Sequence, residues 1–130
     1  MSVDYSIDQA KHATCILGKG RLSPDELVLT VERLAADPDF VPTMRLLADF
    51  SEADLGQLQS AHLEAIASVS PYAIGARCAV VRAGVVAAGA SLEFAFFMEV
   101  HGRNTHRFFS TRAEAIEFLN AGLPESVHMK

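Results

Sequence analysis

The chain has 130 residues, half of them hydrophobic, and a formal net charge of −5 from 16 acidic and 11 basic side chains. This length and apolar content suffice for one domain, residues 1–130, with a continuous core that needs neither metals nor disulfides. The basic residues are dispersed, which argues against nucleic acid as a partner. The N-terminus has no basic segment followed by an apolar stretch, so we expect a cytoplasmic protein without a secretory signal.

The first elements are predicted to be a hairpin and a helix. The β-like runs VDYSID (3–8) and HATCILGK (12–19) are separated by a linker short enough for an antiparallel hairpin. Ser23 precedes a proline and stands three residues before Glu26, a pattern typical of a helix start. We expect a helix over residues 24–36.

The middle of the chain has the pattern strand, helix, strand. Residues 44–50 (MRLLADF) are apolar enough for a mostly buried strand. Either Ser51 or Asp54 is expected to cap a second helix that ends near Ser70. Residues 76–81 (ARCAVV) have the small and β-branched character of a strand covered on both faces.

Residues 84–101 are predicted to form a third helix that is apolar nearly all round. It is too short for a comfortable membrane span and contains Glu93 and Glu99, so we expect a buried or partner-facing helix. Its bulky side chains cannot all face one sheet, because successive residues turn by about 100°. A neighbouring helix, a homodimer partner or a lipid-like ligand would cover the remainder. The candidate apolar interface or pocket comprises Leu92, Phe94, Phe96, Phe97 and Met98.

A last strand over residues 104–109 precedes Thr111 and Glu114, which have the spacing of a capping box for a final helix. The element order is therefore ββαβαβαβα. Repeated strand–helix–strand crossovers require parallel pairing, and the initial hairpin adds an antiparallel pair. We expect an α/β fold with a mixed five-stranded sheet and about four helices.

Catalytic and metal-binding motifs are absent from the sequence. None of the five histidines stands at a compact ligand spacing from another ligand, and there is no nucleophile elbow, glycine-rich nucleotide fingerprint or P-loop. Cys15 and Cys78 lie in apolar β-like runs and are expected to be buried free thiols. We therefore expect a non-enzymatic protein without metal or cofactor.

Four short phrases stand in order along nearly the whole chain: GRLSPDEL (20–27), DPDF (37–40), LLADF (46–50) and FFSTRAEA (108–115). In this order they resemble the SpoIIAA-like proteins, which are related to STAS domains, the anti-sigma-factor antagonists, and to SEC14-like lipid-binding domains. The resemblance implies a SpoIIAA-like fold and a role as a regulatory protein-interaction module. The alternative it implies is SEC14-like binding of a lipid or another apolar small molecule.

In STAS antagonists an Asp ends the third strand and a phosphorylatable Ser opens the next helix, within the motif D-S-S-G-L-G. Asp49 matches the strand-end acid and Ser51 the phospho-acceptor, whereas Phe50 and Glu52 replace the first Ser and the Gly. The resemblance thus implies a switch or interaction turn at Asp49, Ser51 and Asp54. The residues leave two interpretations of Ser51 open, as a helix cap or as a phosphorylation site at a helix N-terminus.

Overall fold

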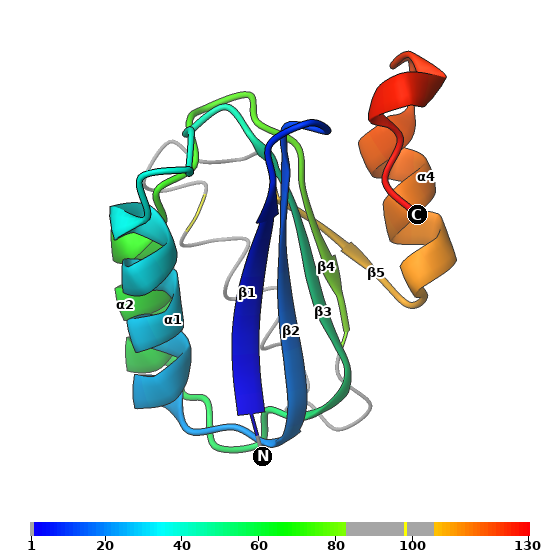
Figure 1. Ribbon diagram of the computed structural model, residues 1–130. Coiled ribbons are helices and arrows are strands. Elements are labelled where there is room, and N and C mark those ends of the chain that lie inside the picture. The colour runs from blue at the N-terminus through cyan, green and yellow to red at the C-terminus, as the bar shows by residue number, and fades with distance from the viewer. Residues whose placement is uncertain (1, 83–97, 99–105) are drawn as a thin grey trace.

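A five-stranded sheet with helices on both faces organises the computed structural model, which describes residues 2–82, 98 and 106–130 (Figure 1). The strands are β1 (Ser2–Asp8), β2 (Ala13–Arg21), β3 (Arg45–Asp54), β4 (Cys78–Val81) and β5 (His106–Phe109). The helices are α1 (Pro24–Ala36), α2 (Ser60–Val69), α4 (Arg112–Asn120) and the short 3₁₀ helix η1 (Glu125–Val127).

The strands lie in the sheet in the order of the chain, β1-β2-β3-β4-β5. β1 pairs antiparallel with β2, and each later pair is parallel. The expected mixed α/β sheet with an initial hairpin is therefore confirmed. The two crossovers that hold α1 and α2 advance in the same direction across the sheet, so right-handed connections place both helices on one face. Figure 1 shows α1 and α2 together on that face and α4 on the other.

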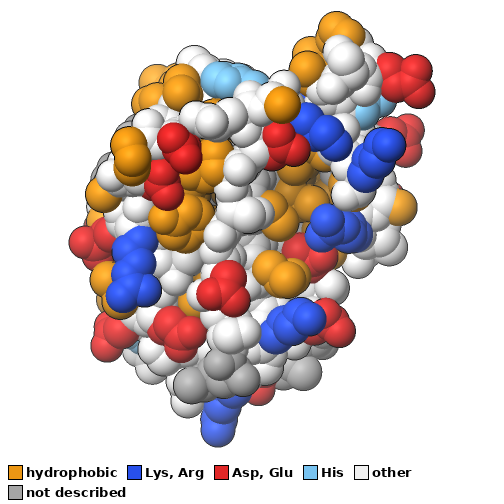
Figure 2. All heavy atoms as spheres, in the orientation of Figure 1, with side chains coloured by type: hydrophobic (Ala, Val, Ile, Leu, Met, Phe, Trp, Pro, Cys, Tyr) orange, Lys and Arg blue, Asp and Glu red, His pale blue; other side chains and the backbone are white. Residues whose placement is uncertain are grey.

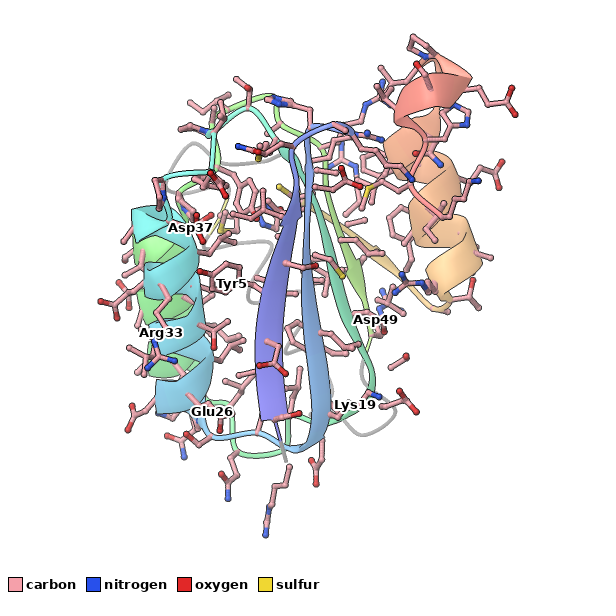
Figure 3. The ribbon with its side chains drawn as sticks, viewed as in Figure 1. Tyr5, Lys19, Glu26, Arg33, Asp37 and Asp49 are labelled. Atoms are coloured by element: carbon pink, nitrogen blue, oxygen red, sulfur yellow. The ribbon has the colours of Figure 1, made fainter. Side chains whose placement is uncertain are left out.

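Helix α1 begins and packs as its sequence predicts. The Ser23 hydroxyl accepts a hydrogen bond from the Glu26 N–H at 3.1 Å, and a proline occupies the first turn. Leu27, Val31 and Leu34 are buried against the sheet. At the other end of the helix, the Tyr5 hydroxyl on β1 donates to Asp37 at 2.8 Å, a contact visible in Figure 3. Helix α1 is thus attached to the edge strand at one end and to the core along its length.

Strand β3 is longer than its sequence predicts, and this changes the position of the candidate turn. After a register shift between Leu17 and Lys19, β2 pairs with β3 again, up to Arg21 opposite Asp54. Ser51 therefore lies within β3 and caps no helix, and the expectation that Ser51 or Asp54 caps the second helix is wrong. Helix α2 instead follows Gln59, whose N–H donates to the His62 ring at 3.0 Å. It ends at Val69, next to the predicted end at Ser70.

Strand β4 is covered on both faces, as expected. Cys78, Ala79 and Val81 are fully buried, with Cys78 in the core under α1 and α2 and the other two in the core under α4. The predicted helix over residues 84–101 lies outside the described residues except for Met98, which is buried. The described part of the chain contains three α-helices where about four were expected. Within it, no helix combines the length and the apolar run that crossing a bilayer needs.

Candidate functional site

Asp49 is a buried carboxylate on the α4 side of β3. It is 5% exposed and accepts three hydrogen bonds within the described structure. Its Oδ1 accepts from the Ser51 N–H at 3.0 Å and from the Ser51 hydroxyl at 2.7 Å, and its Oδ2 accepts from Arg112 Nη1 at 2.9 Å. Figure 3 shows Asp49 between β3 and the start of α4. A single carboxyl group therefore joins a strand residue to a helix on the same face of the sheet.

These contacts keep Asp49 ionised. Burial by itself raises the pKa of Asp49, but the two hydrogen bonds from Ser51 and the guanidinium of Arg112 outweigh it and hold the pKa below its ordinary value of 3.8. A carboxylate stays ionised when buried only with such compensation. Burial removes the hydration of its oxygens, and hydrogen-bond donors must replace that hydration. Asp49 is thus a permanent negative charge at neutral pH.

Arg112, the partner of Asp49, was not among the residues chosen from the sequence. It is the first residue of α4, where the positive end of the helix dipole disfavours a cation. A carboxylate at 2.9 Å offsets that conflict. A basic residue directly after a cap such as Thr111 is the signal in the sequence that points to a nearby acidic partner.

Helix α4 is held at both ends, so the position of Arg112 is well defined. At its start the Thr111 hydroxyl accepts from the Glu114 N–H at 3.3 Å, as the capping pattern predicts. At its end the buried guanidinium of Arg45 donates to the Leu119 carbonyl at 3.0 Å and to the Asn120 side chain at 3.0 Å. Arg45 also donates to the carbonyls of Lys11, at 2.7 Å, and Val127. It therefore joins the hairpin turn, α4 and the C-terminal segment.

Ser51 combines an exposed position with a bond to a buried group. Ser51 is exposed to solvent, yet its hydroxyl donates a hydrogen bond to Asp49. Beside it Lys19 and Glu52 form an exposed ion pair with 3.8 Å between Nζ and Oε2. Asp54 serves a separate turn, where it accepts from the Gly56 N–H at 2.8 Å. The structure thus brings Asp49 and Ser51 together and leaves Asp54 in a turn of its own.

A groove of about 270 Å³ lies between the hairpin strands and α4. Figure 2 shows this face, with hydrophobic, cationic and acidic side chains around a hollow beside α4. Arg112 and Cys15 both line the groove, and burial raises the pKa of the Cys15 thiol. The thiol therefore stays protonated near neutral pH, which disfavours a nucleophilic role. Cys78 is buried, as expected, whereas Cys15 is only partly buried, and both thiols are free.

A second hollow, an apolar cavity of about 100 Å³, lies on the opposite face between the sheet and α1 and α2. Four of its described lining residues are polar or charged: Ser70, Tyr72, Arg82 and His106. The Tyr72 hydroxyl lies 2.6 Å from the Thr14 hydroxyl, which donates to the Arg45 carbonyl at 2.9 Å. The candidate pocket residues Leu92, Phe94, Phe96 and Phe97 lie outside the described residues. The remaining described lining residues are Ile16, Leu27, Val31, Leu46, Ala48, Phe50, Leu55, Leu58, Leu63, Ile66, Val80 and Phe108.

Among their described lining residues, neither hollow holds an arrangement typical of hydrolytic or metal chemistry. Among residues 2–82, 98 and 106–130, no group of three His, Cys, Asp or Glu side chains is placed to bind a metal ion. The chain matches no protein-family model and no curated protein sequence. The Asp49 cluster and the apolar cavity are therefore the two candidate sites of the described structure.

Proposed function

We propose that the chain is a non-enzymatic regulatory protein-interaction module of the SpoIIAA/STAS-like kind, acting in the cytoplasm. Its contact surface is centred on Ser51 and on the start of α4. One observation carries the proposal: the exposed Ser51 shares with Arg112 of α4 a single buried carboxylate, that of Asp49. A chemical change at Ser51 on the surface of β3 would therefore alter the bond between Asp49 and Arg112 of α4.

The surroundings of Ser51 suit contact with another protein. Leu17 is the neighbour of Asp49 in the β2–β3 register and is 37% exposed, so it offers an apolar side chain next to the Asp49 cluster. The ion pair of Lys19 and Glu52 lies nearby, and Arg112 has 44% of its side chain exposed. An apolar centre with charged groups at its rim is a common composition of protein interfaces.

A phosphate on Ser51 would act on the same three groups. It adds a charge of roughly −1.5 to −2, which repels the Asp49 carboxylate and attracts Arg112. The guanidinium would exchange Asp49 for the phosphate, since both are acceptors for a planar fork of donors. The start of α4 would then be bonded to the phosphate on Ser51 in place of the Asp49 carboxylate, and the partner would meet a changed surface. The match of Asp49 and Ser51 to the STAS pattern supports this form of regulation.

Affinity capture from a lysate of the native organism tests the proposal when it is read through variants. Wild-type protein should enrich a partner that is lost with Leu17→Glu and reduced about tenfold or more with Ser51→Asp, because each alters the contact surface. Ser60→Asp is the matched control, since Ser60 is an exposed serine at the start of α2 on the other face. Enrichment of a second, tagged copy of the chain would identify a homodimer. Recovery that is indifferent to Leu17 and Ser51 would contradict the proposal.

We also propose, as a second function, the binding of an apolar small molecule. The apolar cavity under α1 and α2 supports it, because a cavity with such walls gains contacts when an apolar molecule fills it. Native mass spectrometry of gently purified protein should show a bound species that dissociates on denaturation. A mass spectrum with only the bare chain, even after incubation with apolar compounds, would contradict this second function.

A further inference from the structure

Strand β1 leaves one edge of the sheet open. In the described part of the chain it is the outermost strand and pairs with β2 alone, and Figure 1 shows it as the strand nearest the viewer. Its sequence, SVDYSID, contains neither proline nor lysine, and its register with β2 is unbroken from Ser2 to Asp8. Proline, lysine and bulges are common means by which edge strands avoid pairing with another chain. β1 thus keeps a regular edge that can accept a further strand.

The pairing of β2 with β3 shows which backbone groups of β2 are directed at β1. The Arg45 N–H on β3 donates to the His12 carbonyl at 3.2 Å, at the start of the parallel register. Backbone groups alternate in direction along a strand, so the residue after His12 directs its N–H and C=O to the other side. Ala13, Cys15 and Leu17 are therefore the residues that bond to β1.

The same alternation fixes the direction of the backbone groups in β1. The residues of β1 that stand opposite those three are Asp8, Ser6 and Asp4. Their N–H and C=O groups are consequently directed at β2, and those of the residues between them are directed away from it. The outward groups belong to Val3, Tyr5 and Ile7.

We propose that β1 pairs antiparallel with β1 of a second copy of the chain, around a two-fold axis at Tyr5, so that one sheet runs through both copies. Val3 then stands opposite Ile7 of the second copy, and Tyr5 stands opposite Tyr5. Because all three residues have outward backbone groups, this pairing adds about six backbone hydrogen bonds. A two-fold axis makes the contact self-complementary and closes the assembly at two copies. The inference rests on neither of the proposed functions.

The two acidic residues of β1 favour this register over the others. With the axis at Tyr5, Asp4 stands opposite Ser6 of the second copy and Asp8 opposite Ser2, so each carboxylate meets a hydroxyl that can donate to it. A slip of two residues brings Asp4 opposite Asp4 or Asp8 of the second copy, and like charges directly opposite each other destabilise a sheet. Larger slips leave less than half of the strand paired, and a slip of one residue turns outward groups against inward ones.

The side chains with outward backbone groups lie on the α1 side of the sheet and prepare the strand for pairing. Val3 is 8% exposed, and Tyr5 and Ile7 are partly buried against the core under α1 and α2. The bond from the Tyr5 hydroxyl to Asp37, 2.8 Å long, also holds the middle of β1 against α1. A strand that is already fixed loses little conformational entropy when it binds. Contact between Val3 and Ile7 of the second copy would continue this apolar layer from one copy into the next.

The acidic residues and serines of β1 lie on the other face, where α4 packs. Ser6 and Asp8 line the groove between the hairpin strands and α4. A two-fold axis perpendicular to the sheet keeps this face on the same side in both copies. The two grooves would therefore open on one side of the dimer.

The first test measures the mass of the folded chain by light scattering at about 100 μM and on dilution. We expect a dimer whose dissociation constant rises about tenfold in Ser6→Asp, because two pairs of like charges then stand opposite each other. Combining Asp4→Ser with Ser6→Asp restores a hydroxyl opposite each carboxylate and should return the constant to within about threefold of the wild-type value. Ser60→Asp, the same change on α2, is the matched control and should leave the constant unchanged.

Hydrogen exchange followed by NMR shows which edge of the sheet is paired. The amides of Asp4 and Ser6 bond to β2, so they should exchange slowly whether the chain is monomeric or dimeric. Those of Val3, Tyr5 and Ile7 should exchange about tenfold or more slowly in the dimer than in the monomer. This alternation along β1 is expected only if the open edge itself is paired.

Three results would overturn the proposal. One is a monomer at about 100 μM. A dimer in which the amides of Val3, Tyr5 and Ile7 exchange as fast as in the monomer would show that another surface makes the contact. Failure of the combined Asp4→Ser and Ser6→Asp variant to restore dimerisation would contradict the register around Tyr5.

Discussion

The bond between Asp49 and Arg112 makes a measurable prediction about stability. The Asp49 side chain is 7% exposed and that of Arg112 is 44% exposed, with 2.9 Å between Oδ2 and Nη1. A hydrogen bond to a charged group contributes roughly 1.5–3 kcal/mol when buried. Since the Arg112 side chain is partly exposed to solvent, we take about 1 kcal/mol as the coupling between the two residues. Asp49→Ala should destabilise by about 2–3 kcal/mol, because the two bonds from Ser51 are lost as well.

Urea unfolding of Asp49→Ala, Arg112→Ala and the double variant gives the coupling from a double-mutant cycle. The Asp49 contribution also has a pH signature. Because the folded-state pKa lies below the ordinary value of 3.8, this stability is fully present above pH 3.8 and is lost as the pH falls through the lower folded-state pKa. Additive effects of the two substitutions, within about 0.3 kcal/mol, would refute the bond that joins β3 to α4.

Two other substitutions test how the sheet and α4 are assembled. Arg45→Met removes the donor for four acceptors, among them the Leu119 carbonyl, and should lower the free energy of unfolding by about 3–4 kcal/mol in urea; a loss below 1 kcal/mol would refute its role. Gly18→Ala would place a Cβ at 2.7 Å from the Phe50 ring and 2.8 Å from the Leu22 side chain. Both neighbours are buried, so we expect a loss of about 1–3 kcal/mol, seen as a lower Tm, and an unchanged Tm would show that the core yields there.

Local signals in the sequence predicted the elements whose determinants are close together in the chain. Ser23 with Glu26, and Thr111 with Glu114, mark the starts of α1 and α4 within a single turn. After Phe50, local signals of the same kind predicted the wrong structure. Residues 51–54 contain Ser and Asp, which are typical of helix caps, but pairing with Lys19 to Arg21, some thirty residues earlier, extends the strand instead. Pairing partners that are distant in the chain leave no local signature.

The sequence predicted only part of the candidate site, again because contacts between residues that are distant in the chain leave no local signature. Asp49 and Ser51 stand together in the chain, and the structure brings their side chains together as well. Arg112 comes from 63 residues away, and its contact with Asp49 depends on where α4 packs. Arg45 gave a weaker signal, a lone charge inside an apolar strand that requires buried partners. The apolar cavity is formed by side chains of both helices and four strands, so no single segment of the sequence could reveal it.

The most direct test of the central claim is to follow the backbone amides of α4 by ¹H–¹⁵N NMR when only Ser51 is changed. In Ser51→Asp, a second carboxylate beside Asp49 should compete for Arg112. We therefore expect chemical-shift changes and faster hydrogen exchange in the first turn of α4, from Arg112 to Ala115. Ser60→Asp should leave these amides unchanged. Changes confined to β3 in Ser51→Asp would contradict the claim that Asp49 links the surface of the strand to the helix.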